Sequence, residues 1–272
     1  MTFIKIILVA LLVFALYLLA LYFVQDYLIL FPERKYISAQ EVKTPEFQEL
    51  TFSTASGNEV FTWYAKGSPD KPAILFLHGN AGQNATFAPH LLFLVRQGYP
   101  VMIMEYRGFG KSKGRFDEKA VVADAVNAYQ QLKMMGHKQV VVFGYSLGTG
   151  VASGMLETMQ PDGLILLSPF YSMIQMVNER KIPFGQYLLK YPFLSNSYLS
   201  KLNTPLLIVH GRQDPLIPVH HGQQLFERAQ TMDKTGVFLE GQTHNSVFFE
   251  DGAQGTISDW LSDRFKYQMP TK

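Results

Sequence analysis

A serine at the centre of residues 139–152, QVVVFGYSLGTGVA, is the strongest candidate for chemistry in this sequence. Four apolar residues at 140–143 predict a buried strand, and the small residues that follow suit the start of a helix. Between them, G-x-S-x-G at 144–148 is typical of a nucleophile elbow, a sharp turn that exposes the serine hydroxyl. The glycines on either side of Ser146 leave room for such a turn. We therefore predict Ser146 as a nucleophile; the alternative is an ordinary strand-to-helix turn.

A serine nucleophile needs a base, and the base needs an acid to orient it. His244 lies in a loop after the last predicted strand, and Asp214 follows the strand predicted at 206–209. Because the carboxyl ends of parallel strands meet at one edge of a sheet, both side chains can reach the serine there. The chain order Ser146, Asp214, His244 is that of an α/β-hydrolase triad. The alternatives are a loop histidine without a role and an aspartate that only caps a turn or helix.

A glycine-rich turn, HGNAG at 78–82, follows the strand predicted at 73–77. We predict that the backbone N–H of Asn80 faces the serine. Together with the N–H of Leu147 at the helix start, it would form an oxyanion hole. The side chains of His78 and Asn80 are interpreted as structural, because they can shape the turn without touching a substrate.

The elements that must position these groups form repeated strand and helix units after an antiparallel hairpin at 47–53 and 60–65. Continuous apolar runs are typical of strands buried on both faces of a parallel sheet. They occur at 73–77, 101–104, 140–143, 164–167 and 206–209, with a short final strand at 237–239. Helices are predicted at 86–97, 118–135, 149–159, 219–229 and 247–265. The fold class is therefore α/β, with a mostly parallel, doubly wound sheet.

One connection, residues 169–204, is too long for a simple crossover between strands and is rich in aromatic residues and prolines. We predict a small helical lid that shapes an apolar acyl or aromatic pocket. An insertion that merely packs its own aromatic side chains explains the composition equally well, because either would lie at the carboxyl edge of the sheet.

The amino terminus carries an apolar segment, residues 6–24, without a charged side chain. As a helix, this segment spans roughly 28 Å, close to the hydrocarbon thickness of a bilayer. We predict an uncleaved transmembrane anchor at 1–26, a linker at 27–46 and a catalytic domain at 47–267. A cleaved signal peptide is the alternative, although no convincing small-x-small site follows the apolar segment. Basic residues on both sides leave the orientation undecided, and we favour a catalytic domain outside the cytoplasm.

Composition excludes several other classes of protein. The net charge is only +2 without blocks of like charge, so nucleic acid is not expected as a partner. The absence of cysteine excludes disulfides and cysteine-based zinc sites. Neither the loop at 105–112 nor the one at 148–153 matches a P-loop or a dinucleotide fingerprint, so both are interpreted as tight turns. No cofactor and no metal is expected.

As an ordered set, the motifs are specific. They are HGNAG (78–82), YRGFGKSKG (106–114), GYSLG (144–148), HGRQD (210–214) and THN (243–245). Through these motifs the chain resembles the α/β-hydrolase superfamily, over about residues 47–265. It is most similar to the membrane-anchored Bem-type hydrolases and their serine aminopeptidase-like and prolyl oligopeptidase-like relatives. The resemblance implies Ser146 as nucleophile, Asp214 as acid and His244 as base. Glu105 stands where relatives often have aspartate, a departure that we interpret as structural.

The expected function is that of a membrane-anchored serine hydrolase. The resemblance implies hydrolysis of carboxylic esters or thioesters, with protein depalmitoylation in some eukaryotic relatives. The expected partners are a small-molecule or lipid-like acyl substrate or an acylated protein, and membrane lipid around the amino-terminal helix. A serine peptidase or an acyltransferase on the same fold is the alternative enzyme, and a non-catalytic membrane-anchored scaffold is the alternative from another class.

Overall fold

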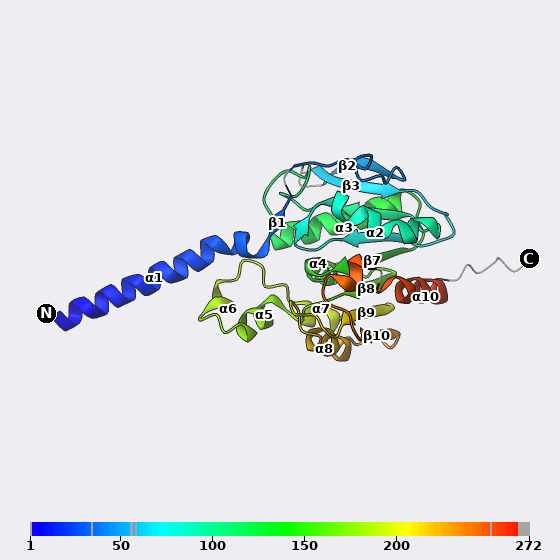
Figure 1. The fold of residues 1–272 in the computed structure, drawn as a ribbon. Helices are drawn as coiled ribbons and strands as arrows, with labels where there is room; N and C mark the ends of the chain where they lie inside the picture. The colour runs from blue at the N-terminus through cyan, green and yellow to red at the C-terminus, as the bar shows by residue number, and fades with distance from the viewer. Residues whose placement is uncertain (1, 34, 55–56, 58, 251, 266–272) are drawn as a thin grey trace, which may run out of the picture.

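The computed structural model describes residues 2–33, 35–54, 57, 59–250 and 252–265. A long helix, α1 (Thr2–Ile29), projects from a layered body built on a central sheet (Figure 1). The sheet contains eight strands in the order β10-β9-β8-β7-β4-β6-β3-β2. Their bounds are β2 (Phe47–Ser53), β3 (Glu59–Ala65), β4 (Ala73–Leu77), β6 (Val101–Met104), β7 (Val140–Tyr145), β8 (Gly163–Leu167), β9 (Leu206–Gly211) and β10 (Lys234–Leu239).

The pairing within the sheet confirms the predicted mostly parallel arrangement. β2 pairs antiparallel with β3, and β3 pairs antiparallel with β6. The five remaining contacts between neighbouring strands, from β6 to β10, are all parallel. The carboxyl ends of β7, β9 and β10 therefore lie along the same edge, where the predicted site residues follow them.

The central strands β4, β6, β7, β8 and β9 are buried on both faces, because each face of the sheet has its own apolar core. Side chains alternate along a strand, so Leu75 and Leu77 of β4 enter one core while Ile74 and Phe76 enter the other. The first core is covered by α3 (Glu118–Met134), α4 (Leu147–Met155) and α8 (His220–Arg228). The second core is covered by α2 (Asn84–Arg96) and α10 (Gln254–Arg264).

The single helix predicted at 247–265 is wrong, because the chain forms two helices there. The short α9 (Ser246–Phe249) ends before α10 begins. Between them Gly252 packs so closely on the side chain of Gln242 that a Cβ would collide with it, and Ala253 N–H donates to the carbonyl of Val247. That bond spans six residues, so the α-helical i→i−4 pattern is interrupted.

The amino-terminal segment makes more contacts than a free anchor and linker would. α1 continues to Ile29, and β1 (Phe31–Pro32) then pairs in parallel with β5 (Ala81–Gly82). Residue 81 belongs to the glycine-rich turn beside the predicted nucleophile. The start of the predicted linker is therefore attached directly to the edge of the sheet where the site residues lie. Residues 1, 34, 55, 56, 58, 251, 266 and 267 of the predicted domains lie outside the described residues.

The lid predicted at 169–204 contains three short helices. They are α5 (Met173–Glu179), α6 (Gly185–Leu188) and α7 (Ser195–Leu199). α7 contacts α4 and α8, whereas α6 contacts α1. In Figure 1, α5 and α6 lie below the inner end of α1, on the side of the body that the anchor leaves. The lid therefore connects the edge of the sheet that carries the predicted site residues to α1.

Candidate active site

Ser146 occupies the turn between β7 and α4 in a conformation that most side chains avoid. Its φ is 52° and its ψ is −118°, a strained backbone typical of a nucleophile elbow. A Cβ on Gly148 would collide with the carbonyl oxygen of Leu77, and one on Gly144 would collide with the carbonyl of Gly148. Only glycine fits these positions, because β4, β7 and α4 approach each other closely at the turn.

The three residues predicted as nucleophile, base and acid lie together. His244 Nε2 is 3.0 Å from Ser146 Oγ, and His244 Nδ1 is 2.7 Å from Asp214 Oδ2. When Nδ1–H donates to the carboxylate, Nε2 of the neutral ring is free to accept the serine proton. All three residues are buried, each about 6% exposed. The geometry suits a histidine that acts as a general base toward the serine hydroxyl.

The carboxylate of Asp214 is held at both oxygens. Oδ1 accepts from the backbone N–H groups of Leu216 and Ile217 at 2.9 and 2.8 Å, while Nε2 of His210 lies 3.3 Å from Oδ2. Burial by itself raises the pKa of Asp214, but the hydrogen bonds from His210, His244 and Ile217 outweigh it and hold the pKa well below its usual range. These contacts therefore favour the ionised carboxylate, the form that accepts a hydrogen bond from His244 Nδ1–H.

His210 is a neighbour of the site that sequence reasoning missed. It is fully buried at the end of β9, and its Nε2 also lies 2.8 Å from the carbonyl oxygen of Ile217. It thus contacts both ends of the turn that carries Asp214. Its position four residues before the aspartate was the available signal, but a strand end alone does not indicate a contact within the following turn.

The glycine-rich turn predicted to supply the oxyanion hole passes close to the serine. A Cβ on Gly79 would lie 3.6 Å from the Cβ of Ser146, and Asn80 and Leu147 line the same cavity as Ser146. The side-chain amide of Asn80 donates to the carbonyl of Ile29 at 2.6 Å, which fixes the turn against the end of α1. Donation by the two backbone N–H groups to an oxyanion stays a prediction.

His78 and Glu105 form a buried pair beneath this turn. His78 Nε2 lies 3.3 Å from Glu105 Oε1, and His78 Nδ1 lies 2.7 Å from the carbonyl oxygen of Gly79. The other carboxylate oxygen of Glu105 accepts from the N–H of Asn84 at the start of α2, at 3.0 Å. These contacts support the structural interpretation of both residues, because they fix the turn from below and do not face the cavity.

A cavity of about 310 Å³ opens beside Ser146. Its walls are mainly aliphatic. The lid contributes Met173, Met176, Ile182 and Leu188, α1 contributes Leu21 and Leu28, and the body contributes Leu147, Leu216 and Ile217. Among the described residues that line it, Arg180 is the only one with a charged side chain. The site is thus an apolar pocket with a nucleophile at one end.

The lid contributes to this pocket in a different way from the one its composition indicates. Of its aromatic residues Phe170 lines the cavity, whereas Tyr191 and Phe193 are buried in the core, where both stack edge-on with Phe116. Tyr191 and Phe193 thus attach the lid to the body. Its aliphatic residues form the pocket, so both explanations of the insertion hold in part.

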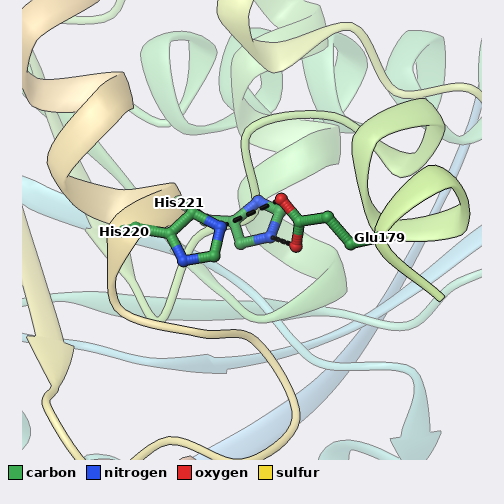
Figure 2. A group of neighbouring side chains, drawn as sticks. All are labelled: Glu179, His220 and His221. Carbon is green, nitrogen blue, oxygen red and sulfur yellow. Dashed lines mark hydrogen bonds and ion pairs between the residues drawn. The ribbon is translucent and has the colours of Figure 1, made fainter.

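A second cluster, Glu179, His220 and His221, joins the lid helix α5 to the start of α8 (Figure 2). The two carboxylate oxygens of Glu179 lie 2.9 Å from Nε2 of His220 and 2.9 Å from Nε2 of His221. These residue types could ligate a divalent metal, since the three ligand atoms lie within 4.8 Å of one another.

The protonation state of His221 favours a hydrogen-bonded cluster over a metal site. Nδ1 of His221 accepts from the N–H of Tyr171 at 3.1 Å, so Nε2 of the neutral ring must carry the proton that it donates to Glu179. Burial lowers the pKa of His221, which favours that neutral ring. A metal at Nε2 would require the opposite tautomer and the loss of the Tyr171 bond. These hydrogen bonds therefore hold α5 against α8.

Comparison with known proteins relates the chain to hydrolases. A family model described as serine aminopeptidase, S33, matches residues 68–193. The lysophosphatidylserine lipase ABHD12 of Danio rerio is 32% identical over 233 residues, which are 73% of this chain and 60% of that protein. Protein ABHD12B of Homo sapiens is 32% identical over 234 residues, which are 75% of this chain and 64% of that protein. The chain thus spans less than two thirds of the length of these relatives.

Solved structures share the fold. The Pyrococcus furiosus esterase Pf2001 superposes with a TM-score of 0.69 over 87% of this chain and 100% of its own, at 20% sequence identity. The predicted α/β-hydrolase fold is therefore confirmed. Motifs, fold and relatives agree, and we conclude that the chain belongs to the α/β-hydrolase superfamily.

Proposed function

We propose that this protein is a membrane-anchored hydrolase that cleaves carboxylic ester or thioester bonds of acyl lipids, with Ser146 as its nucleophile. The observation that supports this most directly is the chain of hydrogen bonds from Asp214 through His244 to Ser146, which ends at the wall of an apolar cavity. Such a cavity suits an acyl chain. With the chain in the cavity, its carbonyl group would lie next to the serine hydroxyl.

In the proposed reaction, Ser146 Oγ attacks the carbonyl carbon while His244 Nε2 takes its proton. Asp214 holds the ring in the required tautomer and stabilises the imidazolium that forms. The backbone N–H groups of Asn80 and Leu147 receive the oxyanion, and one such donor is worth about 10²–10³ in rate in other hydrolases. His244 then protonates the departing alcohol or thiol, and it activates the water that hydrolyses the acyl-enzyme.

The size and lining of the cavity favour a substrate with one acyl chain. A volume of about 310 Å³ is at the low end for small-molecule pockets, and apart from Arg180 and a few polar groups its walls are apolar. Similarity to a lysophosphatidylserine lipase supports a lysophospholipid as the first compound to test. An acylated protein is a further candidate of the same chemistry.

The amino-terminal helix is long and apolar enough over Phe3–Ile29 to cross a membrane. We propose that residues 1–26 form the anchor, 27–46 a linker and 47–267 the catalytic domain, and that this domain lies outside the cytoplasm. Carboxyl-terminal fusions to alkaline phosphatase and to a fluorescent protein that folds only in the cytoplasm test the orientation. Active phosphatase is expected, and fluorescence without phosphatase activity would reverse the assignment.

The test of the proposed function uses the full chain in membranes. A fluorophosphonate probe is expected to label it, and Ser146→Ala is expected to abolish labelling while leaving the protein folded. Ser153→Ala is the matched control, because that buried hydroxyl bonds only the Thr149 carbonyl within α4 among the described contacts. Folded protein that is never labelled would contradict the proposal.

A substrate panel then separates the chemistries that share this site. Monoacyl esters and thioesters of graded chain length are compared with aminoacyl amides, with and without an acceptor alcohol. We expect the esters and thioesters to be hydrolysed fastest. Because the matched family model is described as a serine aminopeptidase, preferential cleavage of the amides would replace the proposal by a peptidase function.

A further inference from the structure

The anchor helix forms part of the cavity wall. Leu21, Gln25, Leu28 and Ile29 of α1 line the same cavity as Ser146. Residues 21, 25 and 29 follow each other at intervals of four, so they lie on one face of the helix. The body of the protein therefore packs against one stripe of α1, and that stripe lies next to the site.

The contact between anchor and lid is specific. Gln25 is buried, and its side-chain amide donates to the carbonyl of Leu188 at 2.9 Å while its side-chain oxygen accepts from the N–H of Lys190 at 2.9 Å. Both halves of one side chain thus bond the backbone of the lid, at the last residue of α6 and two residues after it. A polar residue in an apolar helix is costly unless its groups are paired, and here the lid supplies both partners.

Charged groups show where this helix leaves the hydrocarbon of a bilayer. Asp26 of α1 forms ion pairs with Lys190 at 3.0 Å and with Arg115 at 3.5 Å. Such a network belongs at the level of the lipid headgroups. Residues on the amino-terminal side of Asp26 then lie progressively deeper in the membrane, by 1.5 Å each.

The lid reaches deeper into the membrane than the level of the lipid headgroups. The ring of Phe184, at the start of α6, lies 5.2 Å from the ring of Phe14 in an edge-to-face contact. Phe14 precedes Asp26 by twelve positions, or about 18 Å along the helix axis. That distance is more than half of a hydrocarbon layer of about 30 Å. If α1 spans the bilayer, the tip of the lid must lie inside it.

The sequence of this tip suits insertion. Residues 182–189, IPFGQYLL, carry no charge and are flanked by Arg180, Lys181 and Lys190, a pattern that favours an anionic lipid surface. Phe184 and Tyr187 are 54% and 78% exposed. Phe184 also holds a left-handed backbone conformation (φ 60°), which is costly for an aromatic residue and typical of a functional constraint.

We propose that α1 and the segment 182–189 form one membrane-inserted unit, and that a single-chain lipid passes sideways from the bilayer between them into the cavity. The partner of this surface is thus the acyl region of a phospholipid bilayer. Leu21 and Leu28 from the anchor and Leu188 and Leu189 from the lid line the path, which ends at Ser146. The proposal about the path rests on the proposed function, whereas insertion of the lid tip does not.

Insertion can be measured without any assay of activity. Because the chain has no cysteine, Tyr187→Cys and Met232→Cys each provide one labelling site for an environment-sensitive fluorophore. Met232 is 97% exposed in the loop before β10, away from the anchor, and serves as the control. The full-length variants are reconstituted in phosphatidylcholine and phosphatidylglycerol vesicles that contain lipids with a doxyl quencher on the acyl chain.

We expect strong quenching of the label at position 187 and little at position 232. Equal and weak quenching at both positions would overturn insertion of the lid. Efficient energy transfer between labelled copies at position 187, without quenching by lipid, would also overturn it and would identify a second copy of the chain as the occupant of this surface.

The path is tested with Phe184→Asp, because a carboxylate in hydrocarbon is strongly unfavourable. We expect hydrolysis of a long-chain monoacyl ester in vesicles to fall by roughly tenfold or more, a difference of about 1.4 kcal/mol. Hydrolysis of a short water-soluble ester should change less than about twofold. A parallel loss on both esters, or no loss on either, would overturn the path. A wild-type protein that hydrolyses neither ester would instead contradict the proposed function.

Discussion

Two edges of the molecule are built by different means. At the edge that carries the proposed catalytic residues, here called the catalytic edge, Ser146, Asp214 and His244 follow strand ends that backbone pairing brings together, and tight glycine positions fix the elbow. At the edge between lid and anchor, side chains join segments that are more than 160 residues apart, as in the bond between Gln25 and the Leu188 carbonyl. Strand pairing and tight backbone turns thus determine the structure of the first edge. The second edge depends on a few specific hydrogen bonds and ion pairs between side chains and the lid. The two edges should respond differently to substitution.

The largest effect is expected from Asp214→Asn at the catalytic edge. An amide cannot hold the required tautomer of His244, and the equivalent change in a serine protease lowers turnover about 10⁴-fold. Ester hydrolysis by the purified full chain is the measurement. Asp233→Asn, at an exposed carboxylate paired with Arg264, is the control and should retain activity. A loss of less than about tenfold would mean that Asp214 does not orient the base.

Gly148→Ala should destabilise the same edge by overpacking it. The added Cβ would collide with the carbonyl oxygen of Leu77, so β4 and α4 would have to separate. Overpacking of this kind costs typically about 1–3 kcal/mol, and here we expect at least the upper value because the colliding atom is backbone. Chemical denaturation measures this loss in the free energy of unfolding. Gly255→Ala, where no atom lies within 4 Å of the new Cβ, should be neutral or slightly stabilising.

Gln25→Leu tests the edge between lid and anchor. It leaves the Leu188 carbonyl and the Lys190 N–H without their side-chain partner, at a cost of about 1–3 kcal/mol. Amide exchange at residues 188–190 should therefore accelerate by about tenfold, while exchange in the central strands stays unchanged. Gln97→Leu, which removes only a bond to the exposed Ser258 hydroxyl, is the control. Unchanged exchange at 188–190 would show that the lid does not depend on this pair.

The smallest effect concerns Glu118, whose carboxylate accepts from the N–H of the lid residue Phe193 at 3.0 Å. Burial, and to a smaller extent the neighbouring Asp117, raise the pKa of Glu118 from 4.5 to about 7. The folded state therefore binds this proton more tightly than the unfolded state, so its contribution to stability is present below about pH 4.5 and is lost as the pH rises through 7.

Glu118→Gln keeps an acceptor for Phe193 but removes the charge. We expect it to leave Tm unchanged at pH 5 and to raise it by roughly 2–4 °C at pH 8. Glu227→Gln, on an exposed position of α8, should shift Tm equally at the two pH values. The same difference between pH values in both variants would show that burial of Glu118 is not the cause.

Much of the catalytic edge could be predicted from the sequence. Apolar runs such as 140–143 identified the parallel strands, and the small residues around Ser146 identified the elbow. The break between α9 and α10 could not be predicted, because it depends on Gly252 packing against Gln242, two residues whose contact no periodic pattern indicates. The same holds for His210, which reaches Asp214 only because the intervening turn folds back on the strand end.

The sequence by itself determined the strands, the chain order of the candidate site residues and the apolar character of the amino-terminal helix, since each follows from residues that are close together or regularly spaced. Only the tertiary structure decided that this helix forms a wall of the cavity beside Ser146. The physical reason lies in the range of the interactions. Periodicity and turn chemistry act over a few residues, whereas the pairing of Gln25 with the lid joins positions 163 residues apart and exists only when the sheet has brought both segments to the same edge.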